Sequence, residues 1–489
     1  MSDNLHHRDL WEWAADLLRD PRLFPHMVFD AQRLSKFDGK TFVRFIDEPF
    51  TADTFWNVQS QLPPGGKPLA FVLYADKTRL SSFGTARGYP VVARLVNLPA
   101  DIHNGQGVGS GNIDIFVVGT DALTQVKEDR DHAGKPNWVN FKNAVWHESL
   151  SKILSSLASK SHTGQWFECL DNIQRWFFPI ILILSADYEE QCVMSLIRGI
   201  KCLWPCPVCL VPHDQLLNTL KCYPCWTSAQ LQEVLKAARD EATAEEKEEK
   251  LKEYGLRDIA NAFSTMMCTD VHNALLWDQL HFNGGLYRDH LWAELQKFIV
   301  SLGRAKVAQI DKNYEAFPRW RNLRHLAQVM NISFADGGVY KDISKMVVHA
   351  AHAILTEDDC PRGYLLLRCT RLFLEVDAYA ALEVHTTSGK CVFAITGSAP
   401  APAPPLFRSP LSLQLSAPAP VFTLPSALAP ALTPTPAPVV AFVVKQKYSW
   451  CYTNVTTCSS FYSLGKGKKM CDMKVKEPGN RLVPSPLAK

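Results

Sequence analysis

Two aspartates, Asp76 and Asp187, have the residue type and the sequence setting of a metal-binding carboxylate pair. Each directly follows an apolar stretch, LAFVLYA before Asp76 and PIILILSA before Asp187. Carboxylates at the ends of neighbouring strands can face each other, and a cation between them relieves their repulsion. Oxygen ligands suit Mg²⁺ or Mn²⁺, and two such ions support the cutting and joining of phosphodiesters. The competing interpretation is structural, because aspartate also caps the element that follows a strand.

Four of the fourteen cysteines form a second group with chemical potential. Cys206 and Cys209 lie in the motif CPVC, and Cys222 and Cys225 lie in CYPC twelve residues later. Two thiolates on one tight turn have the spacing of a zinc knuckle, and two such pairs predict a four-thiolate zinc site. Buried, inert thiols are the competing interpretation.

The segments around the two aspartates predict an α/β fold. Apolar runs predict strands at 68–76, 89–99, 112–119 and 177–188. Amphipathic patterns predict a helix within 140–158 and another over 189–200. Three strands, a helix, a strand and a helix are the order of an RNase H-like core, a mixed sheet flanked by helices, although other α/β folds share it.

The rest of the chain divides by composition. We expect a helical N-terminal lead-in at 1–66 and the first part of the core at 67–200. A cysteine-rich, zinc-knuckle-like insert follows at 201–228, and a helical insertion with the last core helix at 229–390. Alternating Pro and Ala begin a low-complexity tail at 391–489, which we expect to be disordered.

Composition excludes several classes of protein. At 47% hydrophobic and 21% charged residues, the 489-residue chain has the composition of a globular protein. Its longest apolar run, WFFPIILILSA, is about half the roughly 20 residues of a membrane-spanning helix. The N-terminus lacks the pattern of a signal peptide, so we expect an intracellular protein. A net charge of +3 means that any DNA contact must come from local basic patches.

Several long segments resemble the Plavaka transposases, a fungal group of DNA transposons related to CACTA-type elements. They include GKPLAFVLYADKTRLSSFGTARGYPVVARLVNLP, FPIILILSADYEEQCVMSLIRG, CPVCLVP, DQLHFNGGLYRDHLW and VMNISFADGGVYKDISKM. The resemblance covers roughly residues 8 to 387. It implies a DDE-type catalytic core with an RNase H-like fold.

The resemblance identifies Asp76 and Asp187 as the first two acids of a triad that holds two Mg²⁺ or Mn²⁺ ions. A late helix, RLFLEVDAYAALEVH, should supply the third acid. We take Glu375 first and Glu383, two helical turns further on, as the alternative. Asp377 is less favoured. Each of these acids could also belong to a solvated helix face.

The resemblance also implies a C-x-x-C pair, here Cys206 and Cys209, and a Leu-His motif, here Leu280 and His281. The further zinc ligands would be His281 or His272, since the family pattern does not include Cys222 and Cys225. His281 is alternatively a DNA contact at the active site, or a core histidine.

Divalent-metal-dependent DNA cleavage and strand transfer at transposon ends is the implied activity, in the nucleus and with no membrane role. The partners are transposon-end and target DNA and, in a homo-oligomer, further copies of the chain. Phosphate contacts are expected from basic side chains that could equally form a solvated face: Arg79, Arg87, Arg319, Arg321 and Arg324.

Two departures from the family pattern support an alternative. No N-terminal zinc-finger pair is present, and the tail replaces the family-like body near His385. An inactive or domesticated transposase that binds DNA without catalysis is therefore the main alternative. A general RNase H-like nuclease without strand transfer is the third hypothesis.

Overall fold

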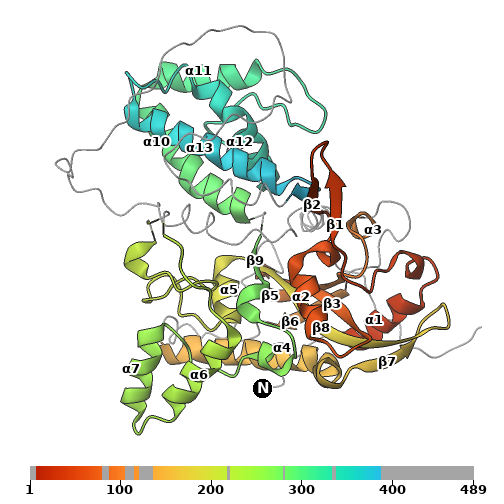
Figure 1. Cartoon of the computed structure of the whole chain (residues 1–489). Coiled ribbons are helices and arrows are strands. Elements are labelled where there is room, and N and C mark those ends of the chain that lie inside the picture. Colours follow the sequence, from red (N-terminus) through yellow and green to blue (C-terminus); the bar gives the residue numbers. More distant parts are fainter. Residues whose placement is uncertain are drawn as a thin grey trace, which may run out of the picture.

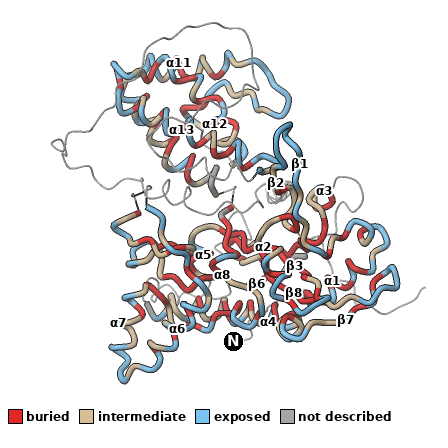
Figure 2. The backbone as a smooth tube through the Cα atoms, in the orientation of Figure 1, coloured by how far each residue is buried: buried red, intermediate tan, exposed pale blue. Residues whose placement is uncertain are grey.

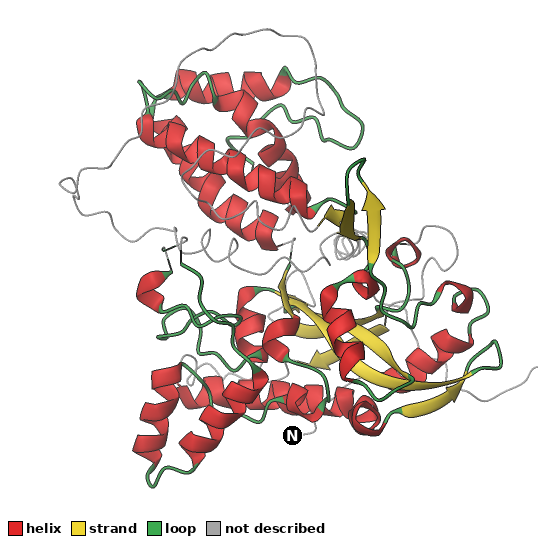
Figure 3. Cartoon of the chain, in the orientation of Figure 1, coloured by secondary structure: helices red, strands yellow, loops and turns green. Residues whose placement is uncertain are grey.

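The computed structural model describes residues 7–79, 87–104, 115–120, 136–216, 218, 221–278, 281–332 and 337–386. These residues form two lobes (Figures 1 and 3), a sheet lobe within 7–278 and a helical lobe within 282–380. The predicted tail from residue 391 lies outside the described residues. In the described part of the chain, no helix combines the length and the apolar character needed to cross a membrane.

A seven-stranded mixed sheet forms the centre of the sheet lobe. β3 (Gly66–Ala75) is antiparallel to β5 (Arg87–Leu95) on one side and parallel to β8 (Gln174–Ala186) on the other. β4 and β6 pair antiparallel with β5, while β9 continues the sheet parallel to β8 and β7 pairs antiparallel with the start of β8. The bounds of these four strands are Thr78–Arg79 for β4, Ile115–Thr120 for β6, Gln165–Glu168 for β7 and Leu275–Trp277 for β9.

Helices cover both faces of this sheet, which explains the almost continuous apolar character of β3 and β8. α1 (Leu10–Arg19) and α4 (Pro136–Thr163) pack on one face, where Trp13, Leu154, Phe71 and Ile181 share one core. α2 (Asp53–Gln61) packs on the other face through Phe55. Buried residues follow these elements (Figure 2).

The predicted strands that end before Asp76 and Asp187 are confirmed, as is the predicted amphipathic helix α4. The predicted helix over 189–200 is shorter than expected, because α5 spans Tyr188–Met194. Leu196 has a φ of 61°, a left-handed conformation that a right-handed helix cannot continue through. The strands β4, β7 and β9 were not predicted.

A small second sheet joins the two ends of the described chain. β1 (Leu34–Phe37) and β2 (Phe42–Ile46) form a hairpin, and β10 (His385–Thr386) pairs with β2. The lead-in, expected to be helical, therefore contains this hairpin in addition to α1 and α2.

Short helices connect these parts. α6 and α7 each begin with a capping box, in which Thr227 pairs with Gln230 and Thr243 with Glu246. The α-helices are α3 (Ala100–His103), α6 (Ser228–Arg239), α7 (Ala244–Tyr254) and α8 (Val271–Ala274), and the 3₁₀ segments are η1 (Phe24–His26), η2 (Pro49–Thr51), η5 (His213–Gln215) and η6 (Ala262–Thr265).

The helical lobe has a core of its own, which includes Tyr287, Tyr314 and Phe373. Its elements are the π-helix η7 (Phe282–Trp292), α10 (Ala293–Ser301), α11 (Arg304–Glu315), α12 (Gly337–Ala351) and α13 (Pro361–Ala380). Because α13 ends at Ala380, Glu383 lies beyond the helix. The expectation that Glu383 lies two turns further along the same helix as Glu375 is therefore wrong.

Candidate metal and catalytic centre

Asp76 and Asp187 follow the carboxyl ends of the adjacent parallel strands β3 and β8. That arrangement brings both side chains to the same edge of the sheet. His281 Nε2 lies 4.0 Å from Asp76 Oδ1 and 4.0 Å from Asp187 Oδ2, so these two oxygens are separated by no more than twice that distance. The structure thus brings His281, singled out by the Leu-His motif, to the aspartate pair that was singled out by its position at the strand ends.

The two oxygens of Asp187 have different surroundings. Oδ1 accepts a hydrogen bond of 2.8 Å from the backbone N–H of Glu190 and caps α5. Oδ2 is the oxygen that faces His281. The capping interpretation therefore accounts for only one oxygen of Asp187. It does not apply to Asp76, which is followed by the strand β4 rather than by a helix.

Asp278, a residue that the sequence analysis missed, orients His281. Its Oδ2 lies 2.7 Å from His281 Nδ1 and accepts a second hydrogen bond of 3.2 Å from the Tyr74 hydroxyl. Because Nδ1 donates to Asp278, Nε2 is the ring nitrogen turned toward Asp76 and Asp187. A sequence signal existed, since ALLWD ends an apolar run with an aspartate as the segments before Asp76 and Asp187 do.

Burial and like charges act together on these carboxylates. Burial raises the pKa of Asp76 to about 6, and Asp187 and Asp278 add to the shift while His281 opposes it. Burial also raises the pKa of Asp187, against the effects of His281 and the Glu189 N–H. Burial lowers the pKa of His281, but its hydrogen bond to Asp278 and the nearby carboxylates outweigh burial and raise that pKa to about 9. The centre therefore carries an excess of poorly solvated negative charge.

Such a donor set suits a divalent cation, because a cation between Asp76 and Asp187 would relieve their repulsion. Within the described ranges, no three His, Cys, Asp or Glu side chains form a group that could hold a metal ion as they stand. The two aspartates alone do not complete a metal site, and a further ligand would be needed.

The structure does not bring the predicted third acid to this pair. Glu375 lies on α13 of the helical lobe, where its carboxylate is 3.1 Å from Arg371 one turn earlier. Glu383 is exposed beyond the end of that helix, and Asp377 is buried within it. In the described residues none of these acids joins Asp76 and Asp187 in a three-residue group. The identity of the third acid stays a prediction.

The CPVC segment forms a tight turn with both thiols buried. Cys206 Sγ and Cys209 Sγ are 3.5 Å apart. The backbone N–H groups of Val208 and Cys209 point to Cys206 Sγ at 3.4 and 3.2 Å. Two sulfurs at tetrahedral positions around zinc, each about 2.3 Å from the ion, have a similar separation. The turn therefore fits a zinc ion in the chemistry and spacing of these two ligands.

The second cysteine pair and His272 lie beside this turn. The backbones of Cys209 and Cys225 form an isolated antiparallel β-bridge, and both residues have free thiols. Cys222 and Cys225 are exposed. His272 Nδ1 is 2.7 Å from the Pro207 carbonyl, and its buried Nε2 has no hydrogen-bond partner in the described structure. Burial lowers the pKa of His272, which favours the neutral ring that metals bind. The contacts of His281, in contrast, are with aspartates.

The basic residues predicted to contact DNA divide into two groups. The side chains of Arg79 and Arg87 lie outside the described residues, although their backbones pair with each other in β4 and β5. Arg319, Arg321 and Arg324 are exposed in the loop between α11 and α12, beside Trp320, which is 64% exposed. Arg324 also lies 3.9 Å from Asp342. A basic and aromatic surface is thus present, and DNA contact stays a prediction.

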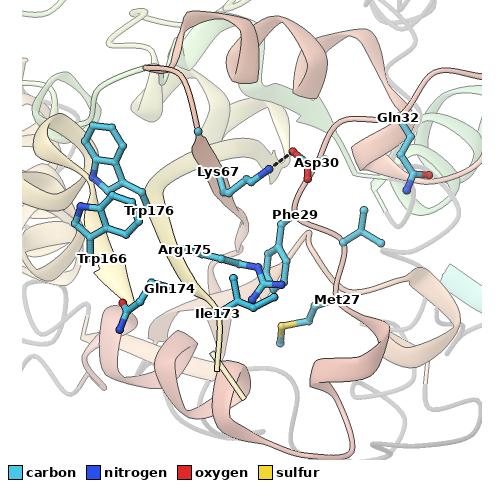
Figure 4. Close-up of a pocket in the computed structure, with 12 residues that line it drawn as sticks. Met27, Phe29, Asp30, Gln32, Lys67, Trp166, Ile173, Gln174, Arg175 and Trp176 are labelled. Carbon is cyan, nitrogen blue, oxygen red and sulfur yellow. Dashed lines mark hydrogen bonds and ion pairs between the residues drawn. The ribbon is translucent and has the colours of Figure 1, made fainter. Parts of the chain in front are cut away.

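A pocket of about 590 Å³ lies at the other end of the sheet (Figure 4). Its lining includes Lys67 of β3, Arg175 and Trp176 at the start of β8, and Trp166 of β7, which stacks on Trp176. Lys67 pairs with Asp30, and Arg175 pairs with Asp171 outside the pocket lining. Since Asp76 and Asp187 follow the carboxyl ends of the same strands, this pocket is not part of the carboxylate centre.

The sheet and its carboxylate–histidine centre define a mixed α/β protein with a candidate metal site at the sheet edge. The family model described as Plavaka transposase matches residues 2–293, which is more than half of the chain. The chain therefore belongs to the Plavaka transposase family, and its function is transposase-related. The matched range contains Asp76, Asp187, Cys206, Cys209 and His281, and Glu375 lies outside it. A search of curated proteins found no match.

Proposed function

We propose that this chain is a DDE-type transposase that cuts DNA at transposon ends and joins the ends to target DNA, using divalent metal ions. The observation that carries the proposal is the convergence of Asp76 and Asp187 on His281 Nε2, each at 4.0 Å. Membership of a transposase family supplies DNA as the partner. Buried carboxylates with strongly shifted pKa values cluster at functional sites.

An RNase H-like core is the fold that we infer for the sheet lobe. Support comes from the strand order β6-β5-β3-β8-β9, with β5 antiparallel to both of its neighbours and β3, β8 and β9 parallel. The chain order of these strands, with α4 before β8 and α5 after it, agrees with the expected arrangement. In this scheme the zinc-knuckle-like insert lies between α5 and β9, and the helical lobe follows β9.

Asp76 and the Oδ2 of Asp187 would hold Mg²⁺ or Mn²⁺, with Glu375 as the proposed third acid. The metal ions would activate a water or sugar hydroxyl and stabilise the leaving oxygen. His281, held by Asp278, presents Nε2 at the carboxylate pair, where it can donate a hydrogen bond to a phosphate oxygen. For Glu375 to take part, α13 must approach the sheet edge when DNA binds.

Zinc at the CPVC turn is a second part of this proposal. Cys206 and Cys209 would be ligands, His272 is the nearby histidine whose Nε2 is open, and Cys222 and Cys225 are further candidates. Such a site would stabilise the insert, which lies between α5 and α6 in the chain. Exposed Arg319, Arg321 and Arg324 would contact DNA phosphates, with Arg79 and Arg87 near the cleaved strand.

The test is cleavage and joining of cognate terminal-repeat DNA by purified protein with Mn²⁺. Asp76→Ala and Asp187→Ala should each abolish both reactions while leaving DNA binding intact. Glu375→Gln and Glu383→Gln separate the two candidates for the third acid. Cleavage that survives both aspartate substitutions would falsify the catalytic proposal.

Matched substrates separate the remaining functions. A non-catalytic DNA-binding protein would bind terminal-repeat DNA with a salt-dependent affinity and show no turnover with any metal ion. A general nuclease would cleave unrelated DNA or RNA–DNA hybrids as readily as terminal repeats. The proposed transposase prefers terminal repeats and joins them.

A further inference from the structure

The β1–β2 hairpin ends in two exposed phenylalanines. Phe37 is 54% exposed and Phe42 is 76% exposed, although both are large apolar side chains. They stand directly opposite each other in the strand register, and their ring centroids are 5.4 Å apart. Figure 2 shows the hairpin turn as exposed. We call Phe37, Phe42 and the turn of residues 38–41 the aromatic tip.

The backbone of the aromatic tip is ordered by its own hydrogen bonds. The Asp38 carboxylate accepts from the backbone N–H groups of Lys40 and Thr41 at 2.8 and 2.9 Å. Gly39 has a φ of 103°, a conformation that side chains disfavour, and a Cβ there would meet nothing within 4 Å. The two rings are therefore presented on a closed turn rather than on a loose loop.

The base of the hairpin is anchored to the rest of the protein. Arg44 donates to the Thr51 carbonyl at 2.8 Å and pairs with Asp53 at 2.8 Å. β10 pairs with β2 at Phe45 and Ile46, next to the base. Support at the base and exposure at the end give the hairpin the form of a rigid projection, which points toward the helical lobe in Figure 1.

The charges around the aromatic tip favour a nucleic acid over a protein partner. Arg33, Lys36 and Lys40 are exposed, and Asp38 is the one acid within residues 33–42. Lysines are depleted at the centres of protein interfaces, whereas they pair readily with phosphates. Aromatic rings beside cations are the usual platform for stacking unpaired bases.

We propose that the aromatic tip is a DNA-binding wedge, in which Phe37 and Phe42 stack on unpaired bases while Lys36 and Lys40 contact the flanking phosphates. The proposal rests on DNA being the partner under the proposed function. It does not require catalysis, because the tip contains none of the residues of the carboxylate centre. Apolar side chains that enter base steps distort the duplex, so the wedge would favour DNA that is already opened.

Binding measurements in the Asp187→Ala background separate this proposal from catalysis. The probes are a single-stranded oligonucleotide, a paired duplex and a duplex with a central single-stranded gap, the last with 2-aminopurine in the gap. Phe37→Ala combined with Phe42→Ala should weaken binding to single-stranded and gapped DNA about five-fold or more. It should also abolish the change in 2-aminopurine fluorescence that binding causes. Binding to the paired duplex should change less.

Three further variants define the outcome. Phe42→Trp keeps an aromatic face and should retain binding. Lys36→Gln combined with Lys40→Gln should reduce the slope of the logarithm of the binding constant against the logarithm of the salt concentration by about one to two for every probe. Trp166→Ala removes an exposed aromatic side chain elsewhere on the sheet and should leave binding unchanged. The unfolding temperature of each variant checks the fold.

Two results would overturn the wedge. One is wild-type affinity of the double alanine variant for every probe. The other is unchanged DNA binding together with loss of self-association in sedimentation, which would assign the aromatic tip to a protein contact. If terminal-repeat DNA is bound through the wedge but never cut with Mn²⁺, the catalytic proposal fails and the wedge stands.

Discussion

Three aspartates surround His281, and a single imidazolium cannot balance the charge of all three. The raised pKa values of Asp76 and Asp187 express the same imbalance, because burial and like charge both disfavour ionisation. Ionised carboxylates in such a site oppose folding, and a bound cation would offset that cost.

Asp76→Asn should stabilise the metal-free protein at pH 8. The wild-type carboxylate, whose pKa is raised to about 6, is ionised there at a cost to folding that the neutral amide does not incur. We expect the free energy of unfolding to rise by on the order of 1 to 2 kcal/mol, measured by urea denaturation without added Mg²⁺. Exposed Asp289→Asn, the control, should change little. A loss of stability in Asp76→Asn would contradict the charge imbalance.

Asp278→Asn should lower the pKa of His281. Burial alone lowers that pKa, and the hydrogen bond to Asp278 is the largest of the effects that raise it to about 9. Because the folded value lies above the ordinary histidine value, His281 stabilises the fold below about pH 6.5, and that contribution is lost as pH rises through 9. NMR titration of the ring in both proteins gives the shift directly.

Tyr74→Phe is the matched control for that titration. It removes one hydrogen bond to Asp278 and keeps the charge, so the pKa of His281 should move less than in Asp278→Asn. An unchanged pKa of His281 in Asp278→Asn would mean that other carboxylates stabilise the protonated ring.

At the level of elements, the turn of residues 206–209 is held by the strand-like segment that contains Cys225. Backbone hydrogen bonds join Leu210 to Pro224 and Trp226 to Val208. This pairing brings the second cysteine motif beside the first, and His272 reaches the same turn through its bond to Pro207. The element is therefore assembled from three separate stretches of chain.

Purified protein should contain about one zinc ion per chain, bound at this turn. Cys206→Ser should lose the zinc and unfold at a lower temperature, since metal binding to the folded turn contributes folding energy. Elemental analysis and thermal unfolding provide the two measurements. Cys369→Ser, at an exposed position of α13, is the control and should keep the metal. His272→Ala and Cys222→Ser then identify the further ligands, and full zinc content in Cys206→Ser would refute the site.

At the scale of the whole molecule, the end of the described chain returns to its beginning. His385 and Thr386 pair with Ile46 and Phe45, so β10 joins the segment after α13 to the hairpin of the sheet lobe. The two lobes have separate cores, and this pairing is one of the connections between them. The position of α13 relative to the carboxylate centre therefore depends in part on β10.

A chain that ends after Leu382 should exchange the β2 amides faster than a chain that ends after Thr386. The shorter chain lacks β10, so the bonds that β10 makes with β2 are absent, while the pairing of β1 with β2 and the contacts of Arg44 remain. Hydrogen exchange of peptides that cover residues 42–46 measures the difference. Equal protection in both chains would show that β10 does not hold the hairpin in solution.

The sequence by itself determined the elements whose pattern is local. Long apolar runs predicted β3 and β8 and placed Asp76 and Asp187 at their ends, because a strand buried on both faces is apolar along its whole length. The helical periodicity of α4 and the C-x-x-C turn were recognisable because their patterns also lie within one short segment. The family was likewise apparent from contiguous segments.

Only the tertiary structure decided which of these residues meet. His281 follows β9, and its approach to Asp76 and Asp187 depends on β9 pairing with the end of β8, a contact between segments far apart in the chain. The role of Asp278 beside His281 also depends on packing between distant parts of the chain. The same holds for the early end of α5 and for the exposure of Phe42. Residue patterns record burial along one element, whereas the neighbours of that element are chosen by the packing free energy of the whole chain.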